Sequence, residues 1–403
     1  MQSTLAWPNE QSRRIPGWVY TDPAIYAREQ ERIFGGRSWN YVGLTSEIPR
    51  PGDFLQTYVG EHPVVVVRDH QSRIRVFVNR CTHRGSQFCL VPHGHAEMFI
   101  CPYHQWTFGL DGELKAVPFR RGIGGKGGMS DCFDPSHHGL EQLAVAERHG
   151  VIFASYANDV EPIEEYLGPT ILSYFDRVCD GRPLEVIGTM RHRLDANWKL
   201  QIENLKDTAH AALMHAFFVK FGIWRNDQNT EIKVGARGAS SVLVSTGSFR
   251  PIAAARNEAI TPDFDLEDKR MVTYRREFEH GTTAILTIWP NLIILQNMNL
   301  LAMRHVRPDG PNACIKSWTF FGYEGEAPEL RQARLMQANL LGPSGLVTID
   351  DNEVLACAQD GVAASPFANS VIEAGTGSGD ADHLMSESAI RAFYDCYRKV
   401  MDL

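Results

Sequence analysis

The sequence has no long hydrophobic run. Among its 403 residues, no stretch approaches the roughly 18 consecutive apolar residues that a transmembrane helix requires. Residues 1–18 also lack the apolar segment that characterises a secretory signal peptide. These absences exclude membrane-spanning and secreted proteins from the classes that we expect. They favour a cytoplasmic chain that makes no contact with a membrane.

Positive charge is scarce as well. The formal net charge is −8 at pH 7 and the isoelectric point is about 6.0, which argues against nucleic acid as a partner because nucleic-acid-binding proteins depend on basic surfaces. No dinucleotide-binding fingerprint is present in the sequence. The glycine run at residues 121–128 lacks a Ser or Thr after its lysine, and we expect a surface loop there rather than a phosphate-binding loop.

Cysteine is infrequent and irregularly placed. The eight cysteines do not form the regular framework of a disulfide-rich secreted protein. In a reducing compartment, we expect two of them to be metal ligands and the others to be free thiols.

The chain is too long for one ordinary hydrophobic core, so we expect two domains. Residues 1–40 are predicted to form an arm and a helix that begins where Asp22 is followed by a proline. Residues 41–155 contain short β-branched runs separated by turn residues, which indicates a small all-β domain. Residues 156–403 combine several strands with helices. The predicted fold class is therefore α+β, with an antiparallel sheet and surrounding helices in a helix-grip arrangement in the larger domain.

Hydrophobic periodicity predicts several elements of the larger domain. Helices are expected at residues 198–219, 328–341 and 386–401. Strands are expected at residues 185–194, 271–278, 282–288, 292–297, 302–306 and 315–321.

Two Cys–His pairs lie close together in the first half of the chain. The first is Cys81 with His83, and the second, after a further seventeen residues, is Cys101 with His104. In a Rieske [2Fe–2S] centre, two cysteines hold one iron and two histidines hold the other. Zinc accepts the same four donors, but zinc sites usually present cysteines and histidines as separate pairs. One Cys and one His from each loop suit a two-iron cluster, so we favour a Rieske centre and keep structural zinc as the alternative.

A second candidate site lies in the helical pattern of residues 198–219. It contains His210 and His215, which could also be ordinary polar residues. On a regular helix, side chains five residues apart point about 140° away from each other. One metal ion could bind both histidines only if the helix breaks or bulges between them, and we predict such an irregularity. Asp207 lies three residues before His210 and shares a helical face with it.

A carboxylate is needed to complete this second site. Two histidines and one carboxylate form a facial triad that leaves positions on Fe(II) open for dioxygen. The adjacent pair Asp350 and Asp351 follows a glycine-containing turn and is the best candidate. Composition alone does not single out this pair among the 48 acidic residues.

Together, these motifs resemble the large (α) subunits of Rieske non-haem iron ring-hydroxylating oxygenases along essentially the whole chain. A closer resemblance is to the branch that contains salicylate 5-hydroxylase, anthranilate dioxygenase and terephthalate dioxygenase. That closer resemblance is carried by residues 101–106, by residues 166–171 with 174–177, and by residues 221–225.

The resemblance assigns the four residues of the Cys–His pairs to the cluster. Cys81 and Cys101 would ligate one iron of the [2Fe–2S] cluster, and His83 and His104 would ligate the other.

The resemblance also assigns the second site. His210, His215 and Asp351 would ligate a mononuclear Fe(II), with Asp351 preferred to Asp350 because relatives keep an aspartate at the second position.

Asp207 and Asn204 would act in catalysis. By resemblance, Asp207 would join a cluster histidine of one subunit to an iron histidine of its neighbour by accepting both imidazole N–H groups. That role implies a homotrimer (α3), or an α3β3 assembly with a small β subunit. The chain departs from its relatives at Thr208 and Ala209, where a bulkier pair is common, and this departure concerns the packing around the ligands.

Arg304 and Arg391 match arginines that hold the substrate carboxylate in the terephthalate enzyme. A planar guanidinium binds a carboxylate through two parallel hydrogen bonds, although both arginines could instead form ordinary ion pairs. The implied function is O2-dependent hydroxylation of an aromatic carboxylate of the salicylate, anthranilate or terephthalate type. Electrons would come from NADH through a separate reductase or ferredoxin.

Three other functions stay open at this point. The first is the same chemistry on a neutral arene. The second is a Rieske electron carrier without oxygenase activity, and the third is a zinc-stabilised binding protein.

Overall fold

The computed structural model describes residues 5–8, 11–221, 223, 229–246, 267–278 and 283–403. Of the motif at residues 221–225, positions 222, 224 and 225 lie outside the described residues. The chain divides into two compact units: residues 34–160, and residues 1–33 together with residues 161–403. Within the described ranges, no helix has the length and apolarity needed to cross a membrane.

The unit of residues 34–160 contains three small antiparallel sheets, whose strand orders are β10-β11-β2, β5-β4-β3-β6 and β7-β8-β9. The strands are β2 (Asn40–Leu44), β3 (Asp53–Val59), β4 (His62–Arg68), β5 (Ile74–Val78), β6 (His93–His95), β7 (Met98–Ile100), β8 (Thr107–Gly109), β9 (Leu114–Ala116), β10 (Ala144–Arg148) and β11 (Val151–Ser155). This confirms the expectation that the β-branched runs of this region form short strands.

The β4–β5 hairpin shows why this region folds as it does. Residues 64–67 are four consecutive valines, all of them buried, as expected of a strand that is covered on both faces. At the turn, the buried carboxylate of Asp69 accepts hydrogen bonds from the backbone N–H groups of Gln71 and Arg73, each at 2.9 Å. The turn is therefore stabilised by a side chain, and it fixes the register of the hairpin.

The unit of residues 1–33 and 161–403 is built on one seven-stranded antiparallel sheet of order β12-β18-β17-β16-β15-β14-β13. Its strands are β12 (Leu184–Leu194), β13 (Asn229–Val234), β14 (Ser241–Thr246), β15 (Thr283–Ile288), β16 (Leu292–Asn297), β17 (Leu300–Pro308) and β18 (Cys314–Tyr323). A separate pair joins β1 (Arg14–Pro16) to β19 (Asn369–Val371).

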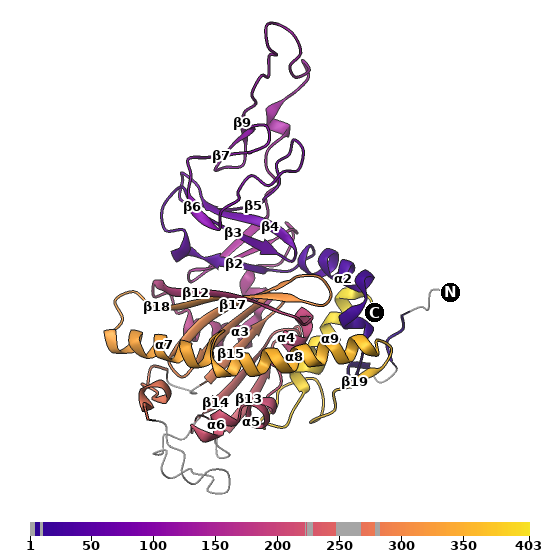
Figure 1. Cartoon of the computed structure of the whole chain (residues 1–403), viewed down its shortest axis with the longest axis vertical. Helices are drawn as coiled ribbons and strands as arrows, with labels where there is room; N and C mark the ends of the chain where they lie inside the picture. Colours follow the sequence, from indigo (N-terminus) through magenta and orange to yellow (C-terminus); the bar gives the residue numbers. More distant parts are fainter. Residues whose placement is uncertain (1–4, 9–10, 222, 224–228, 247–266, 279–282) are drawn as a thin grey trace. The chain divides into compact units, whose positions relative to one another are not determined.

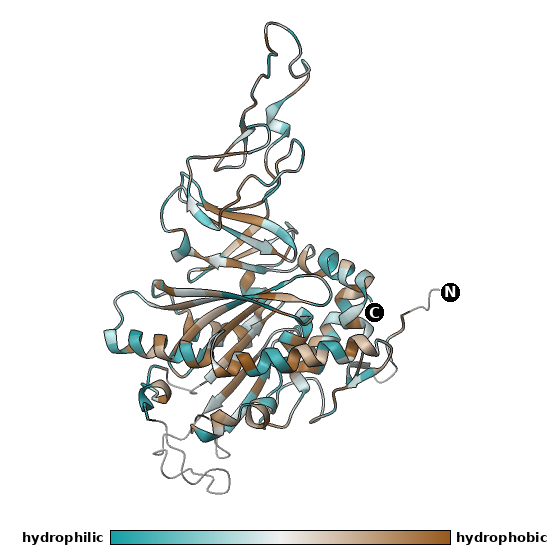
Figure 2. Cartoon of the chain, viewed as in Figure 1, coloured by the Kyte–Doolittle hydropathy of each residue, from teal (hydrophilic) through white to brown (hydrophobic). Residues whose placement is uncertain are grey.

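Helices cover this sheet. They are α1 (Trp18–Thr21), α2 (Pro23–Glu29), α3 (Ile163–Val178), α4 (Trp198–Asn204), α5 (His210–Met214), α6 (Ala216–Lys220), α7 (Pro328–Leu341), α8 (Leu346–Ala364) and α9 (Ser388–Met401). Figure 1 shows α7 and α8 crossing the strands. Figure 2 shows that the strands of the sheet are mostly hydrophobic, whereas hydrophilic and hydrophobic residues alternate along α7 and α8. The predicted α+β class is confirmed by this arrangement of an antiparallel sheet and surrounding helices.

The start of α2 follows the sequence prediction. The Asp22 carboxylate accepts hydrogen bonds from the backbone N–H groups of Ala24 and Ile25, at 2.7 and 3.1 Å. Pro23 occupies the first helical position, where the missing N–H has no cost because no partner exists for it.

Two predicted elements differ from the structure, and several of its elements, including α8, were not predicted. Residues 271–278 do not form a strand; the segment begins with a 3₁₀ turn at Lys269–Val272 and then runs without regular structure. The single helix expected at residues 198–219 is three short helices, α4, α5 and α6. The 19-residue helix α8 was not predicted, because its apolar residues form no clear helical stripe and its exposed face also carries Leu346, Ile349 and Val354.

Candidate active site

The two Cys–His loops repeat one backbone pattern. The carbonyl oxygen of Cys81 accepts the N–H of Gly85 at 2.9 Å, and that of Cys101 accepts the N–H of Gln105 at 2.9 Å. Gly85 and Gln105 both have positive φ angles, of 76° and 55°. Each loop therefore closes one turn through a left-handed residue, which is unstrained for the glycine and costs free energy for the glutamine. Strain of this kind persists where the surrounding structure holds the loop, as the hydrogen bond between the Cys101 N–H and the Trp106 carbonyl does at 2.9 Å.

Each loop presents a buried thiol and a partly exposed imidazole. Cys81 and Cys101 are buried in a core cluster with Trp106, and burial raises the pKa of the Cys81 thiol. The rings of His83 and His104 lie 4.6 Å apart between centroids. His83 also stacks on Trp106 at a centroid distance of 4.6 Å.

The imidazoles are suited to bind metal in the neutral form. Burial lowers the pKa of His83, and nearby His104 and Arg84 lower it further. The Nδ1 atom of His104 is buried and has no hydrogen-bond partner among the described residues. It is therefore an imidazole nitrogen placed to take a metal rather than a proton donor or acceptor of the protein.

The four cluster residues do not converge on one point. Ligand atoms around a single tetrahedral zinc ion would lie within about 4 Å of one another. Among the described residues, only His210, His215 and Asp351 bring three potential ligand atoms within 4.8 Å of each other. The two Cys–His pairs do not form such a group among the described residues, which does not favour one zinc ion. In a two-iron cluster, the two thiols would hold one iron and the two imidazoles the other.

The second candidate site is formed at the break that was expected between its histidines. His210 is the first residue of α5 and His215 immediately follows its end, with φ −84° and ψ 75°, which are not helical. This confirms the predicted irregularity, in the form of a break rather than a π-bulge. The change of direction brings both rings to one side, with a centroid distance of 5.5 Å.

Both imidazoles present Nε2 to the same carboxylate oxygen. His215 Nε2 lies 3.3 Å and His210 Nε2 lies 3.7 Å from Asp351 Oδ1. The Nδ1 atom of His210 is hydrogen-bonded to the Asp207 carbonyl at 2.8 Å, and that of His215 to Asp350 Oδ2 at 3.2 Å. When Nδ1 is occupied in this way, Nε2 is left as the metal-binding nitrogen.

Asp350 and Asp351 are therefore used differently. Asp351 faces both Nε2 atoms, while Asp350 orients His215 from behind. Asn204 also donates to Asp351 Oδ1 from its side-chain nitrogen at 3.3 Å. Burial alone would lower the pKa of His215, but Asp351 and Asp350 outweigh it and raise that pKa. Burial would raise the pKa of Asp351, but His215 and His210 outweigh it and lower that pKa.

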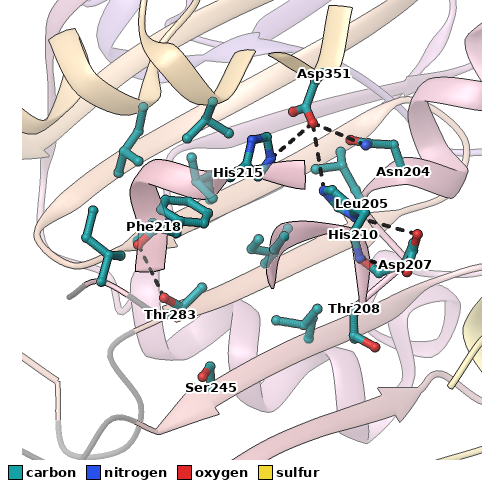
Figure 3. Close-up of a pocket in the computed structure, with 18 of the residues that line it drawn as sticks. Asn204, Leu205, Asp207, Thr208, His210, His215, Phe218, Ser245, Thr283 and Asp351 are labelled. Carbon is teal, nitrogen blue, oxygen red and sulfur yellow. Dashed lines mark hydrogen bonds and ion pairs between the residues drawn. The ribbon is translucent and has the colours of Figure 1, made fainter. Parts of the chain in front are cut away.

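These ligand candidates open onto a cavity of about 110 Å³. Figure 3 shows Asp351, His215 and His210 on one side, and Thr283 and Ser245 on the side away from Asp351. Most of the remaining wall is apolar and comes from Leu205, Ala211, Phe218, Ile223, Leu243, Ile285, Leu295, Leu341, Val347 and Leu384. A flat apolar molecule with few polar groups would suit this lining.

Arg304 lines the same cavity. The residue is only 6% exposed, and its guanidinium lies 3.7 Å from the centre of the Trp318 ring. Its Nε atom is buried and has no hydrogen-bond partner among the described residues. Burial lowers the pKa of Arg304 to about 9, with Asp351 opposing that shift, so the side chain is still a cation at neutral pH. A buried cation without an anionic partner favours the binding of an anion in the cavity.

Arg391 does not fulfil the role expected for it. It is 2% exposed, it is not part of the cavity lining, and its guanidinium donates to the carbonyl oxygens of Gly377, Ile372 and Ala374 at 2.6 to 3.1 Å. Arg391 thus fixes the segment that precedes α9, whose Leu384 reaches the cavity wall. The arginine binds backbone carbonyls, and the expectation of a second substrate anchor at this position is corrected.

Lys316 was missed by the sequence reasoning. Its buried ammonium donates to Gln201 Oε1 at 2.6 Å and to Asn352 Oδ1 at 2.9 Å, and burial lowers its pKa to about 8. It therefore ties α4 to α8 beside Asp351. The one signal in the sequence that could have identified Lys316 is its position as a lysine in an otherwise apolar strand pattern.

Two family models match the chain. A Rieske [2Fe–2S] domain matches residues 38–125, and the catalytic domain of the ring-hydroxylating alpha subunit matches residues 182–403. The chain belongs to the ring-hydroxylating oxygenase alpha subunits. It is 45% identical to the large oxygenase component of salicylate 5-hydroxylase from a Ralstonia species, over 98% of this chain and 96% of that one. It is 39% identical to the large subunit of anthranilate 1,2-dioxygenase from Burkholderia cepacia, over 99% and 96%.

A solved structure agrees with this family in fold. Naphthalene 1,2-dioxygenase with indole bound in the active site superposes with a TM-score of 0.82, at 22% identity, covering 98% of this chain and 93% of that chain. At this identity, the likeness supports the fold alone.

Alpha subunits of this family carry a Rieske [2Fe–2S] cluster and a mononuclear iron. The donor sets of this chain fit both groups. In the first set, His104 Nδ1 is buried and lacks a hydrogen-bond partner among the described residues. In the second set, His215 Nε2 is buried and faces the Asp351 carboxylate at 3.3 Å. Two histidines and one carboxylate are also the set that suits non-haem Fe(II).

Proposed function

We propose that this alpha subunit hydroxylates an aromatic ring that carries a carboxylate. The observation that carries the proposal is Arg304, a buried cation in the wall of an apolar cavity beside a 2-His-1-carboxylate set. Its Nε atom has no hydrogen-bond partner among the described residues. The relatives named for salicylate and anthranilate act on such rings. Arg304 would hold the carboxylate, while the apolar wall would hold the ring and exclude water.

In the assignment that we propose, residues 41–155 form the electron-carrying domain and residues 156–403, with the arm of residues 1–40, form the substrate domain. Cys81, His83, Cys101 and His104 would hold the cluster, and His210, His215 and Asp351 would hold the mononuclear iron. When bound, the iron supplies dioxygen activation and the cluster supplies electrons.

The residues of the chain itself would position the reactants. Asp350 and the Asp207 carbonyl hold the two imidazoles by Nδ1, so that both Nε2 atoms face Asp351. Asn204 holds Asp351 Oδ1 by a hydrogen bond. One or two oxygen atoms would enter the ring at the carbon that Arg304 and the apolar wall direct toward this set.

Electrons would reach the iron between neighbouring copies of the chain, which we propose to form a trimer with or without a small β subunit. The Asp207 side chain is 34% exposed, so its carboxylate is accessible to an imidazole N–H of another subunit. Exposed apolar side chains occur near both ends of this route, at Leu213 and Met385 near Asp207 and at Ile100 and Tyr103 in the second Cys–His loop region. Patches of this kind mark protein interfaces. NADH would act through a reductase or ferredoxin, as is typical of this family.

The proposal is tested by the substitution Arg304→Met. The purified oxygenase would be reconstituted with a reductase and assayed on a panel of benzoates and on neutral arenes, with product analysis. Loss of the charged hydrogen bonds should raise KM for benzoates by roughly 10- to 100-fold and leave neutral arenes unaffected. Arg191→Met is the matched control, because Arg191 is exposed on β12. Turnover of neutral arenes alone, with benzoates untouched, would contradict the proposal.

A further inference from the structure

Three rows of side chains cross the cavity face of the seven-stranded sheet. Residues two apart along a strand point to the same face, and the register of the strands aligns them across the sheet. The first row contains Arg304, which is paired with Ile293 of β16. The second row is apolar and passes through Leu243, Ile285 and Leu295.

The third row is polar. Thr230 of β13 pairs with Ser245 of β14, Ser245 pairs with Thr283 of β15, and Thr283 pairs with Asn297 of β16. All four residues line the cavity, and we call them the polar row. Uninterrupted cross-strand pairing of four polar residues on the inner face of a sheet is unusual, because this face normally carries apolar side chains.

The polar row has hydrogen-bonding capacity directed at the cavity. Thr283 Oγ1 donates to Asn297 Oδ1 at 3.2 Å. The amide nitrogen of Asn297 is a further hydrogen-bond donor of the row. Thr230 is 7% exposed, so its hydroxyl is largely shielded from solvent. Water therefore competes little for the hydrogen bonds of this hydroxyl.

The polar row is also uncharged. Among the described lining residues, the cationic side chain other than the two histidines of the iron set is Arg304, which belongs to the first row. Arg391, the other expected anchor, lies outside the lining. A second carboxylate at the polar row would therefore be buried without a cation, which is strongly unfavourable. A hydroxyl or amino group would be satisfied there by the hydroxyl and amide groups.

We propose that the polar row is a second recognition subsite, which binds a neutral hydrogen-bonding substituent of the ring whose carboxylate Arg304 holds. This inference rests on the proposed function. The first and third rows are four residues apart along the strands, or roughly 13 Å, and the long arginine side chain shortens that interval. A single ring over the apolar second row thus meets Arg304 on one side and the polar row on the other. The substrate class is a hydroxylated or aminated aromatic monocarboxylate, rather than a dicarboxylate or an unsubstituted benzoate.

The test compares binding rather than turnover. Dissociation constants of benzoate, the three hydroxybenzoate isomers and terephthalate would be measured by calorimetry on the metal-loaded oxygenase. The variant is Thr283→Val with Asn297→Leu, with Thr283→Val alone as a milder second variant. Thr319→Val on β18 is the matched control, because its side chain points to the opposite face from Trp318 and Phe320. Circular dichroism and the visible absorption of the cluster would report that each variant is folded.

The wild type should bind one hydroxybenzoate isomer more tightly than benzoate, and terephthalate more weakly. The double variant should weaken that isomer by about tenfold, equivalent to one or two lost hydrogen bonds, and change benzoate by less than about twofold. The inference is overturned if the wild type does not prefer any hydroxybenzoate, or if the variant weakens benzoate and hydroxybenzoate equally. Failure of the proposed function appears elsewhere: Arg304→Met would then leave benzoate binding unchanged, while the hydroxyl preference is still measurable.

Discussion

The two metal-binding regions of this chain differ in where their donor residues come from and in what orients them. In the cluster region, both Cys–His loops close with the same backbone hydrogen bonds, and the donors follow one another within residues 81–104. In the iron region, the donors come from α5, from the break after it and from α8. They are oriented by the Asp207 backbone carbonyl and by the side chains of Asp350 and Asn204. The cluster histidines are partly exposed, whereas His215 and Asp351 are buried.

The difference follows from what each site must do. A cluster that exchanges electrons with other proteins needs rigid ligands near a surface, and short loops anchored in a small core provide them. A site that activates dioxygen beside a substrate must exclude water, which requires walls from several distant elements. A site enclosed by several distant elements also buries charged side chains. Lys199 pairs with Glu29 at 2.6 Å with both side chains fully buried, and Lys316 lies beside Asp351.

The largest expected effect comes from removing the carboxylate of the iron region alone. Asp351→Ala should abolish tight iron binding at this site and lower product formation by more than about 100-fold, which is the upper range for partners outside the ligand set. The cluster should be unaffected because its donors are local. Iron and sulfide content, the visible spectrum and turnover would be measured together. Glu353→Ala, an exposed position on the same helix, is the control, and a variant that keeps both iron and activity would contradict the assignment of Asp351.

A second prediction tests whether electrons pass from the cluster of one subunit to the iron of another. Chains with Cys101→Ser would lack the cluster, and chains with Asp351→Ala would lack the iron. Neither should be active alone, but mixed assemblies should regain a substantial part of the activity if electrons cross from one copy to the next. Adding Asp207→Asn to the Cys101→Ser chain should remove the recovered activity, since the amide keeps the hydrogen bond from the Ala209 N–H (2.9 Å in the wild type) but no longer offers a carboxylate to two imidazoles. Mixed assemblies without any activity would exclude this electron route.

How far the sequence predicts each region reflects the same contrast. The order and spacing of Cys81, His83, Cys101 and His104 favoured a two-iron cluster in the sequence, because local turns place these residues; their roles as ligands stay a prediction. The break between His210 and His215 was also predictable, since a regular helix cannot direct both side chains to one ion.

The remaining features depend on tertiary structure. Periodicity did not reveal α8, so the placement of Asp351 opposite the histidines could not be derived from it. Arg304 and Arg391 are indistinguishable as sequence letters; one faces a cavity and the other binds backbone carbonyls. The polar row exists only through the register of four strands, two of which, β13 and β14, were not predicted.

A smaller effect is expected where a buried cation supports the iron region. Lys316→Met removes the connection from α4 to α8, and the transfer of iron from the protein to a chelator should become about tenfold faster, the lower range for partners outside the ligand set. Lys316→Gln, which keeps a donor, should recover part of the loss. The cluster spectrum should not change in either variant. If both variants release iron at the wild-type rate, the connection between the helices does not position Asp351.

The smallest expected effect concerns the pH dependence of stability that arises from Glu203 in α4. Burial raises the pKa of Glu203 to about 7, opposed by hydrogen bonds from Tyr394 and Tyr20. The folded protein thus keeps the Glu203 proton up to about pH 7, whereas the unfolded chain loses it near the ordinary value of 4.5. The folded state binds more protons between these values, so this contribution to stability is complete below pH 4.5 and is lost as the pH rises through 7.

Glu203→Gln, which mimics the protonated acid, should be more stable than the wild type at pH 8 by on the order of 2 kcal/mol and about equal to it at pH 5. Urea unfolding of the metal-loaded protein at both pH values measures the difference. The exposed substitution Glu353→Gln should leave the pH profile unchanged. A pH profile of Glu203→Gln parallel to that of the wild type would show that Glu203 is ionised throughout, and that the iron region tolerates a buried charge there as it does at Lys199.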